Sequence, residues 1–162
     1  MIDLKGKMNF RQFLNSSNEE FREEQLKLYN IDLFDASKDI IMKVERAVEL
    51  IVFSEIYCPD CRIVMPYLKK IEEINDNIEI SIYPREGNEK AMKDYVGIAR
   101  IPTVIKIDNK EKLEGRFIEF PKEISETLDR LTEEEREEVI DKYRRGEYNE
   151  LIEKDLINKV IL

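Results

Sequence analysis

Histidine is absent from the 162 residues of this chain, and only two cysteines are present. The absence of histidine excludes Ser-His-Asp catalytic triads and most histidine-based metal sites. No apolar run approaches the roughly 20 residues that a membrane-spanning helix needs. A glycine-rich nucleotide-binding motif is also missing, so we expect no bound NADPH. These absences leave the two thiols as the only evident nucleophiles.

Acidic residues outnumber basic residues by 36 to 27, which gives a formal net charge of −9. This excess of negative charge argues against nucleic acid and anionic membranes as partners. The first residues contain no apolar stretch of the kind found in signal peptides, so we expect a cytoplasmic protein. The length fits one domain with appended segments.

The two cysteines, Cys58 and Cys61, lie between a strand pattern and a helix pattern. Residues 48–54 are apolar and rich in β-branched side chains, which predicts a buried strand. Residues 63–74 have the periodicity of an amphipathic helix. On a helix, residues three apart have Cα atoms roughly 5 Å apart, which a disulfide can bridge. The spacing therefore predicts a redox pair in which one thiol attacks and the other resolves.

Position favours Cys58 as the attacking thiol. The N-terminus of a helix stabilises a thiolate, and Pro59 suits the first helical turn. Asp60 opposes a second negative charge, and we expect Arg62 to offset part of this effect. We therefore expect the Cys58 pKa toward the upper end of the range ~3.5–7.5 known for such thiols. Cys61, further into the helix, is expected to be more buried and to resolve the mixed disulfide.

Three other roles for the cysteines are weaker. If both were merely small buried hydrophobes, nothing would account for their spacing and their place after a strand. A zinc site would need carboxylates or a second subunit, since structural zinc usually has four Cys or His ligands. A permanent disulfide is not reliably kept in the cytosol, and a loop this short would stabilise little.

The remaining pattern predicts alternating helices and strands. Residues 31–35 could form a strand or a loop, so the sheet has four or five strands. Ser37 is expected to cap the helix that follows, and Gly115 is expected to mark a bulge. The other predicted strands are 47–55, 78–83, 98–107 and 112–120. The predicted helices are 9–14, 18–29, 37–46, one from the cysteine motif to 74, 88–96, 121–131, 132–146 and 148–162.

This order of elements, with Cys-x-x-Cys at the first strand-to-helix junction, resembles thioredoxin from about residue 44 to 131. The stretch 57–62, Tyr-Cys-Pro-Asp-Cys-Arg, is similar to the family's Trp-Cys-Gly-Pro-Cys-Lys. The stretch 96–103, Val-Gly-Ile-Ala-Arg-Ile-Pro-Thr, is similar to Tyr-Gly-Ile-Arg-Gly-Ile-Pro-Thr. The two stretches are separated in sequence as they are in thioredoxins, and together they are more specific for this family than Cys-x-x-Cys alone. In the family the second motif holds a cis proline beside the cysteines, which implies Pro102 here.

The resemblance implies an α/β chain with the thioredoxin fold. We expect a central mixed sheet of four or five strands with flanking helices, plus N-terminal and C-terminal helical extensions. The expected divisions are an N-terminal helical extension at 1–30, a thioredoxin-like domain at 31–131, and a C-terminal helical tail at 132–162 that packs on the domain.

Three departures from the family pattern bear on function. Val52, six residues before Cys58, stands where thioredoxins usually carry a buried aspartate that assists proton transfer. Tyr57 replaces the usual tryptophan. The dipeptide Pro59-Asp60 makes the motif similar to that of small cytosolic thioredoxin-related proteins, whose substrates differ from those of general thioredoxins.

The implied activity is that of a cytoplasmic thiol–disulfide oxidoreductase of the protein-disulfide reductase type. Cys58 and Cys61 are the expected catalytic residues, Ile101 and Pro102 are expected to bind substrate, and Tyr57, Pro59 and Asp60 complete the motif. Expected partners are a protein or small molecule with a disulfide, and a thioredoxin-reductase-type enzyme or low-molecular-weight thiol as electron donor. We expect no metal and no cofactor beyond the reversible disulfide.

An alternative of another class is a non-catalytic or redox-regulated binding module on the same scaffold. The missing aspartate and the extra helices favour this alternative.

Overall fold

A computed structural model describes residues 3–162, and its centre is a mixed sheet in the order β2-β1-β3-β4. The strands are β1 (Val48–Phe53), β2 (Ile78–Tyr83), β3 (Thr103–Ile107) and β4 (Leu113–Ile118). β1 pairs with β2 in parallel and with β3 antiparallel, and β3 pairs antiparallel with β4. The prediction of a mixed sheet with flanking helices is confirmed.

The sequence allowed either a strand or a loop at residues 31–35, and no fifth strand forms there. Residues 31–34 have no regular structure, and Phe34 is exposed at the start of a helix. The side chain of Asp32 accepts a hydrogen bond from the Leu33 N–H, so this backbone group is not available to a sheet. The sheet therefore has four strands.

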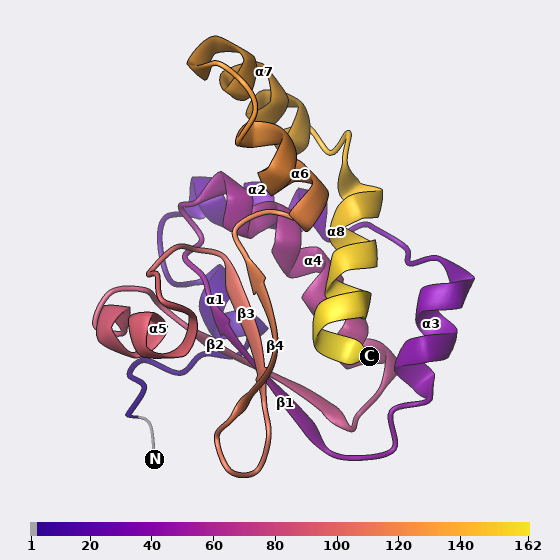
Figure 1. The fold of residues 1–162 in the computed structure, drawn as a ribbon. Helices are drawn as coiled ribbons and strands as arrows, with labels where there is room; N and C mark the ends of the chain where they lie inside the picture. The colour runs from indigo at the N-terminus through magenta and orange to yellow at the C-terminus, as the bar shows by residue number, and fades with distance from the viewer. Residues whose placement is uncertain (1–2) are drawn as a thin grey trace.

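Helices cover both faces of the sheet, with α5 on one side and α4 and α8 on the other (Figure 1). Along β1, Leu50 and Val52 face the larger core, and Ile51 and Phe53 face the smaller core below α5. All four side chains are buried because successive strand residues point to opposite faces. The helices are α1 (Phe10–Leu14), α2 (Glu19–Leu28), α3 (Asp35–Met42), α4 (Pro59–Ile74), α5 (Glu89–Val96), α6 (Lys122–Leu128), α7 (Glu133–Arg144) and α8 (Asn149–Leu156), followed by the π-helical turn η1 (Ile157–Ile161). None of the helices described within residues 3–162 is long and apolar enough to cross a membrane.

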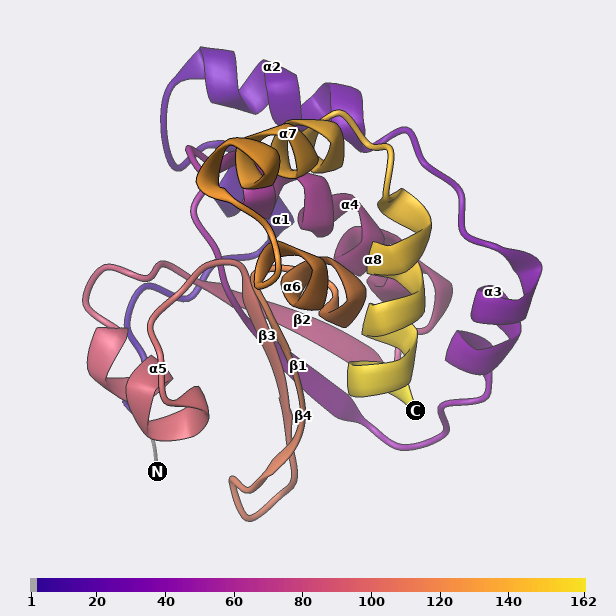
Figure 2. The ribbon, with the colours of Figure 1, turned by 45° about the horizontal axis from the view of Figure 1, so that its top comes forward.

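The segments at both ends of the chain contact the sheet. Met8 pairs with Ile82 through two backbone hydrogen bonds, so the outer edge of β2 is covered there. The last turn, η1, packs against β4. Both α2 and α7 contact α4, and they lie at the same end of the molecule in both views (Figures 1 and 2).

The prediction that Ser37 caps the third helix was wrong. α3 begins at Asp35, with Phe34 before it, and no side chain caps its first turn. The Ser37 hydroxyl instead donates a 2.7 Å hydrogen bond to the carboxylate of Glu153 in α8. The same carboxylate accepts a bond from the Phe34 N–H. A carboxylate from a distant helix thus joins the residue before α3 to the Ser37 side chain in its first turn.

Gly115 is required by a close contact between β4 and η1. The strand pairing is irregular here, since Lys106 lies opposite Gly115 and Ile107 lies opposite Leu113. This irregularity lies beside Gly115, as predicted. A Cβ atom added at Gly115 would lie 1.9 Å from the backbone oxygen of Lys159. Only glycine lets the two backbones approach so closely.

We predict that Gly115→Ala lowers the free energy of unfolding by about 2–3 kcal/mol, because β4 and η1 must separate. Urea unfolding measures this loss. Glu114→Ala, at a half-exposed neighbouring position, is the control and should cost only about 0.5 kcal/mol. Equal stability of the two variants would contradict the close packing.

Candidate active site at the start of α4

The cysteine motif lies at the turn from β1 into α4. Cys58 is the N-cap residue of α4, with extended backbone angles, and Pro59 is the first helical residue. Proline fits this position because it lacks an N–H, and the first N–H groups of a helix have no partner inside the helix. The Cys58 N–H donates to the Glu55 oxygen at 3.0 Å, which fixes the turn before the helix. The side chain of Cys58 therefore lies at the N-terminus of α4.

Cys58 is partly exposed, and its surroundings lower the pKa of its thiol to about 7. The largest cause is hydrogen bonding from the Cys61 thiol, and the backbone N–H groups of Cys61 and Asp60 act in the same direction. Partial burial and the negative charge of Asp60 oppose these effects. Near neutral pH a large share of Cys58 is therefore thiolate, in line with the value expected from the sequence.

Cys61 has the opposite character. Its side chain is fully buried, and this burial raises the pKa of its thiol well above the ordinary value. The Ser54 hydroxyl is buried near Cys61 and lowers the Cys61 pKa slightly, so it offsets only part of the effect of burial. At neutral pH the Cys61 thiol keeps its proton and can donate it toward Cys58. The two thiols are thus chemically distinct.

Asp60 pairs with an arginine that the sequence did not suggest. Arg144, at the end of α7, donates from Nε to Oδ1 at 2.9 Å and from Nη2 to Oδ2 at 3.1 Å. The Asp60 side chain is only 8% exposed, whereas Arg144 is 41% exposed. This ion pair joins the C-terminal extension to the dipeptide between the cysteines.

The prediction that Arg62 offsets the Asp60 charge was wrong. Arg62 points toward the N-terminal extension, where it pairs with Glu24 at 3.0 Å and lies over the Phe21 ring. It also donates to the Ile56 oxygen at 2.8 Å. In addition, the Gln25 side chain donates to the Arg62 backbone oxygen at 2.9 Å. Arg62 therefore fastens the first turn of α4 to α2.

A groove of about 340 Å³ opens beside Cys58. The lining residues are Tyr57, Cys58, Pro59, Asp60, Arg85, Arg100, Ile101 and Glu119. The peptide bond between Ile101 and Pro102 is cis. Pro102 itself is buried, and its backbone oxygen accepts a 2.7 Å bond from the Glu119 N–H. Of the two predicted substrate-binding residues, Ile101 is among the lining residues of the groove and Pro102 is not.

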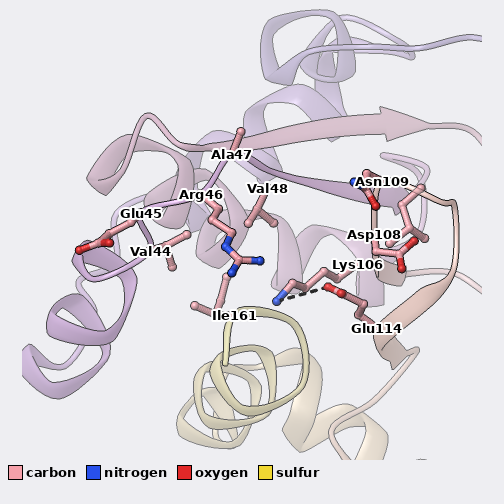
Figure 3. A pocket seen from close by; sticks show the side chains of 11 residues that line it. Val44, Glu45, Arg46, Ala47, Val48, Lys106, Asp108, Asn109, Glu114 and Ile161 are labelled. Atoms are coloured by element: carbon pink, nitrogen blue, oxygen red, sulfur yellow. Dashed lines mark ion pairs between the residues drawn. The ribbon is translucent and has the colours of Figure 1, made fainter.

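A pocket larger than this groove lies away from both cysteines. It has a volume of about 680 Å³, and residues at the start of β1 and the end of β3 line it (Figure 3). Lys106, one of its lining residues, pairs with Glu114 at 3.9 Å across this pocket. Neither cysteine lines it, so its size does not make it the candidate active site.

Val52 lies in the larger core and is fully buried among apolar side chains. Two buried carboxylates occur among residues 3–162, at Asp60 and Glu153. Asp60 is held by Arg144, and Glu153 bonds to α3. Within the same residues, no three Cys, Asp or Glu side chains gather as a metal site would require.

Comparison with known proteins agrees with this geometry. The sequence pattern of the family described as thioredoxin matches residues 7–135. The chain belongs to the thioredoxin family. A thioredoxin of Mycoplasmopsis pulmonis is 30% identical over 95 residues, which cover 54% of this chain and 85% of that protein. Membership supports a thiol–disulfide oxidoreductase in general terms.

Two solved structures share the thioredoxin fold of this chain. A Pseudomonas aeruginosa protein of unknown function superimposes with a TM-score of 0.77 at 22% identity, over 93% of this chain and 89% of the other. An HIV epitope-scaffold superimposes with a TM-score of 0.75 at 22% identity, over 93% and 90% of the two chains. Because both matches cover nearly the whole chain, the fold they share includes segments beyond residues 44–131.

Sequence reasoning missed four charged residues near the cysteines. They are Arg85, Arg100, Glu119 and Arg144. Glu119 has a positive φ of 63°, which is uncommon outside glycine, and burial raises the pKa of its carboxyl. Arg100 pairs with Glu119 at 3.5 Å. Proximity of Arg100 to the Ile-Pro motif was the one available signal, and no local pattern marks the other three.

We predict that Cys58 in the reduced protein reacts with iodoacetamide at least about 100-fold faster than Cys61 at pH 7, since the thiolate is the reactive form. The midpoint of the Cys58 pH–rate profile should lie near the pKa of about 7. Timed labelling followed by peptide mass spectrometry separates the two sites. Equally slow labelling of both thiols in the native protein would contradict the described site.

Proposed function

We propose that this thioredoxin-family protein is a disulfide reductase of the cytoplasm, with Cys58 as the attacking thiol and Cys61 as the resolving thiol. The observation that carries the proposal is the difference between the two thiols. Cys58 is partly exposed with a pKa of about 7, whereas Cys61 is fully buried with a raised pKa. This difference fits a two-step exchange in a fixed order.

In the first step the Cys58 thiolate attacks one sulfur of a substrate disulfide. A mixed disulfide forms, and the other substrate sulfur leaves as a thiolate. In the second step Cys61 loses its proton and attacks the Cys58 sulfur. The Cys58–Cys61 disulfide forms, and the second substrate sulfur leaves as a thiolate that takes up a proton. Two electrons thus pass from the protein to the substrate.

A return to the dithiol state needs two electrons from another thiol system. A thioredoxin-reductase-type enzyme or a low-molecular-weight thiol would supply them by the same exchange chemistry. The chain itself offers no recognisable nucleotide-binding motif. The reversible disulfide is then the only redox group that the cycle requires.

The substrate is a protein or a small molecule with an accessible disulfide. The groove beside Cys58 has Tyr57 and Pro59 on its lining together with Ile101. Tyr57 is 49% exposed and offers an aromatic surface to a bound chain. An extended substrate segment in this groove would lie against Ile101, which lines it.

Substitution of each cysteine by serine tests the proposal. We predict that Cys58→Ser abolishes reduction of a protein disulfide such as that of insulin, because no nucleophile remains at the exposed position. Cys61→Ser should still attack but should not resolve, so a mixed disulfide through Cys58 should accumulate. Turnover assays with dithiothreitol as donor measure the first effect. Intact-mass analysis of the reduced variant, mixed with substrate after the dithiothreitol has been removed, measures the second.

A redox-regulated binding module is the second candidate. The fully buried Val52, in place of the carboxylate usual in the family, favours it. Such a module would show no turnover above the dithiothreitol background in the wild-type protein, and no mixed disulfide in Cys61→Ser. These two outcomes together would overturn the reductase proposal.

A further inference from the structure

The ion pair between α7 and α4 reaches across 84 positions of sequence into the redox motif. Two parallel hydrogen bonds join the Arg144 guanidinium to the Asp60 carboxylate, at 2.9 and 3.1 Å. A two-point contact fixes orientation as well as distance and is stronger than a single-point contact. Asp60 is nearly inaccessible to water, so solvent screens its charge poorly.

The charge on Asp60 bears directly on Cys58. Both residues belong to the first turn of α4, and the Asp60 charge raises the pKa of the Cys58 thiol. A carboxylate beside a forming thiolate is unfavourable because like charges repel. A guanidinium held against that carboxylate reduces the repulsion. Arg144 is the only cation within residues 3–162 that pairs with Asp60.

α7 holds Arg144 in place by its own packing. Tyr143, the preceding residue, is fully buried, and its ring meets Phe120 edge-on at 5.1 Å. At the other end of α7, Thr132 and Glu135 form a reciprocal capping box. The guanidinium therefore projects from the end of α7 that is packed into the core, and the capping box stabilises the start of the same helix.

Other charged and titratable groups face the motif from every neighbouring element. Arg100 is paired with Glu119, and Arg62 is paired with Glu24, so both cations are engaged elsewhere. The remaining groups near the site are Glu55 in the turn before α4, Tyr57 and Cys61 in the motif, Arg85 after β2, and Arg136 and Tyr143 in α7. None of these makes the two-point contact with Asp60 that Arg144 makes.

We propose that Arg144 is a positioning residue of the redox site, which holds the Asp60 carboxylate in an ion pair and thereby permits negative charge on the Cys58 sulfur. The C-terminal extension is then a working part of the active site. This inference rests on the proposed function for the role of Cys58, but it concerns the thiolate equilibrium and not turnover.

The test removes the charge of Arg144, of Asp60, and of both residues together. For each variant, the rate of Cys58 alkylation in the reduced protein is measured against pH, and the midpoint of this profile is compared with that of the wild type. Arg144→Gln should raise the midpoint from about 7 by about one pH unit, because Asp60 is left uncompensated. Asp60→Asn alone should lower it, since Arg144 then has no carboxylate partner. The double variant, Asp60→Asn with Arg144→Gln, should return the midpoint close to the wild-type value.

Two further variants separate charge from packing. Arg145→Gln is the matched control, because Arg145 follows Arg144 in sequence and pairs at the surface with Glu147. It should leave the midpoint unchanged. Arg144→Lys keeps the charge without the two-point geometry and should give a smaller upward shift than Arg144→Gln.

An unchanged midpoint in Arg144→Gln would overturn the inference. An upward shift that Asp60→Asn does not reverse would also overturn it, since Arg144 would then act through helix packing alone. Turnover of a disulfide substrate is measured in parallel. A protein without turnover that still shows the reversible shift would contradict the proposed function and leave this inference standing.

Discussion

The first turn of α4 places the Cys58 sulfur beside the Cys61 thiol and the backbone N–H groups of Cys61 and Asp60, and the redox site depends on these donors. These donors favour negative charge on the residue at the N-cap, which is Cys58. A strand buried on both faces, β1, leads into this turn and fixes where the helix starts. The difference between a reactive Cys58 and a protonated Cys61 follows from one residue lying at the helix end and the other in the core.

Asp60 places a conflicting charge in that same turn, and both extensions of the chain contact residues of this turn. On one side, Gln25 and Glu24 of α2 hold the backbone and side chain of Arg62. On the other side, Arg144 of α7 holds Asp60. The first turn of α4 is thereby fastened to both helical extensions. Segments outside the region of clearest sequence resemblance thus contact the residues that carry the chemistry.

The features that the sequence predicted are those with a local signal. The run of apolar residues before Cys58 has the composition of a strand buried on both faces, and the three-residue spacing of the cysteines is typical of a redox pair at a helix start. The resemblance of the Ile-Pro-Thr stretch to the thioredoxin pattern likewise implied its place beside the cysteines, where Ile101 lines the groove. Gly115 was predicted to mark an irregularity, although its close contact with Lys159 was not foreseen.

The features that the sequence did not predict depend on contacts between distant segments. Charged side chains are numerous, and spacing alone does not say which acid meets which base. Arg62 lies two residues from Asp60 but pairs with Glu24, whereas Asp60 pairs with Arg144, 84 residues away. For the same reason Ser37 bonds to Glu153 rather than capping its own helix. Partner choice here is set by the packing of α2, α7 and α8, which no local pattern reveals.

The equilibrium reduction potential of the Cys58–Cys61 couple decides whether this site can work as a reductant. Titration against a dithiothreitol or glutathione buffer, with the thiols counted by mass after quenching, gives this value. We predict a reversible two-electron couple between about −200 and −280 mV, where cytosolic reductants can keep the dithiol reduced. A potential above about −150 mV would indicate an oxidant or isomerase and would contradict a reductase. The absence of any reversible couple would contradict redox function at this site altogether.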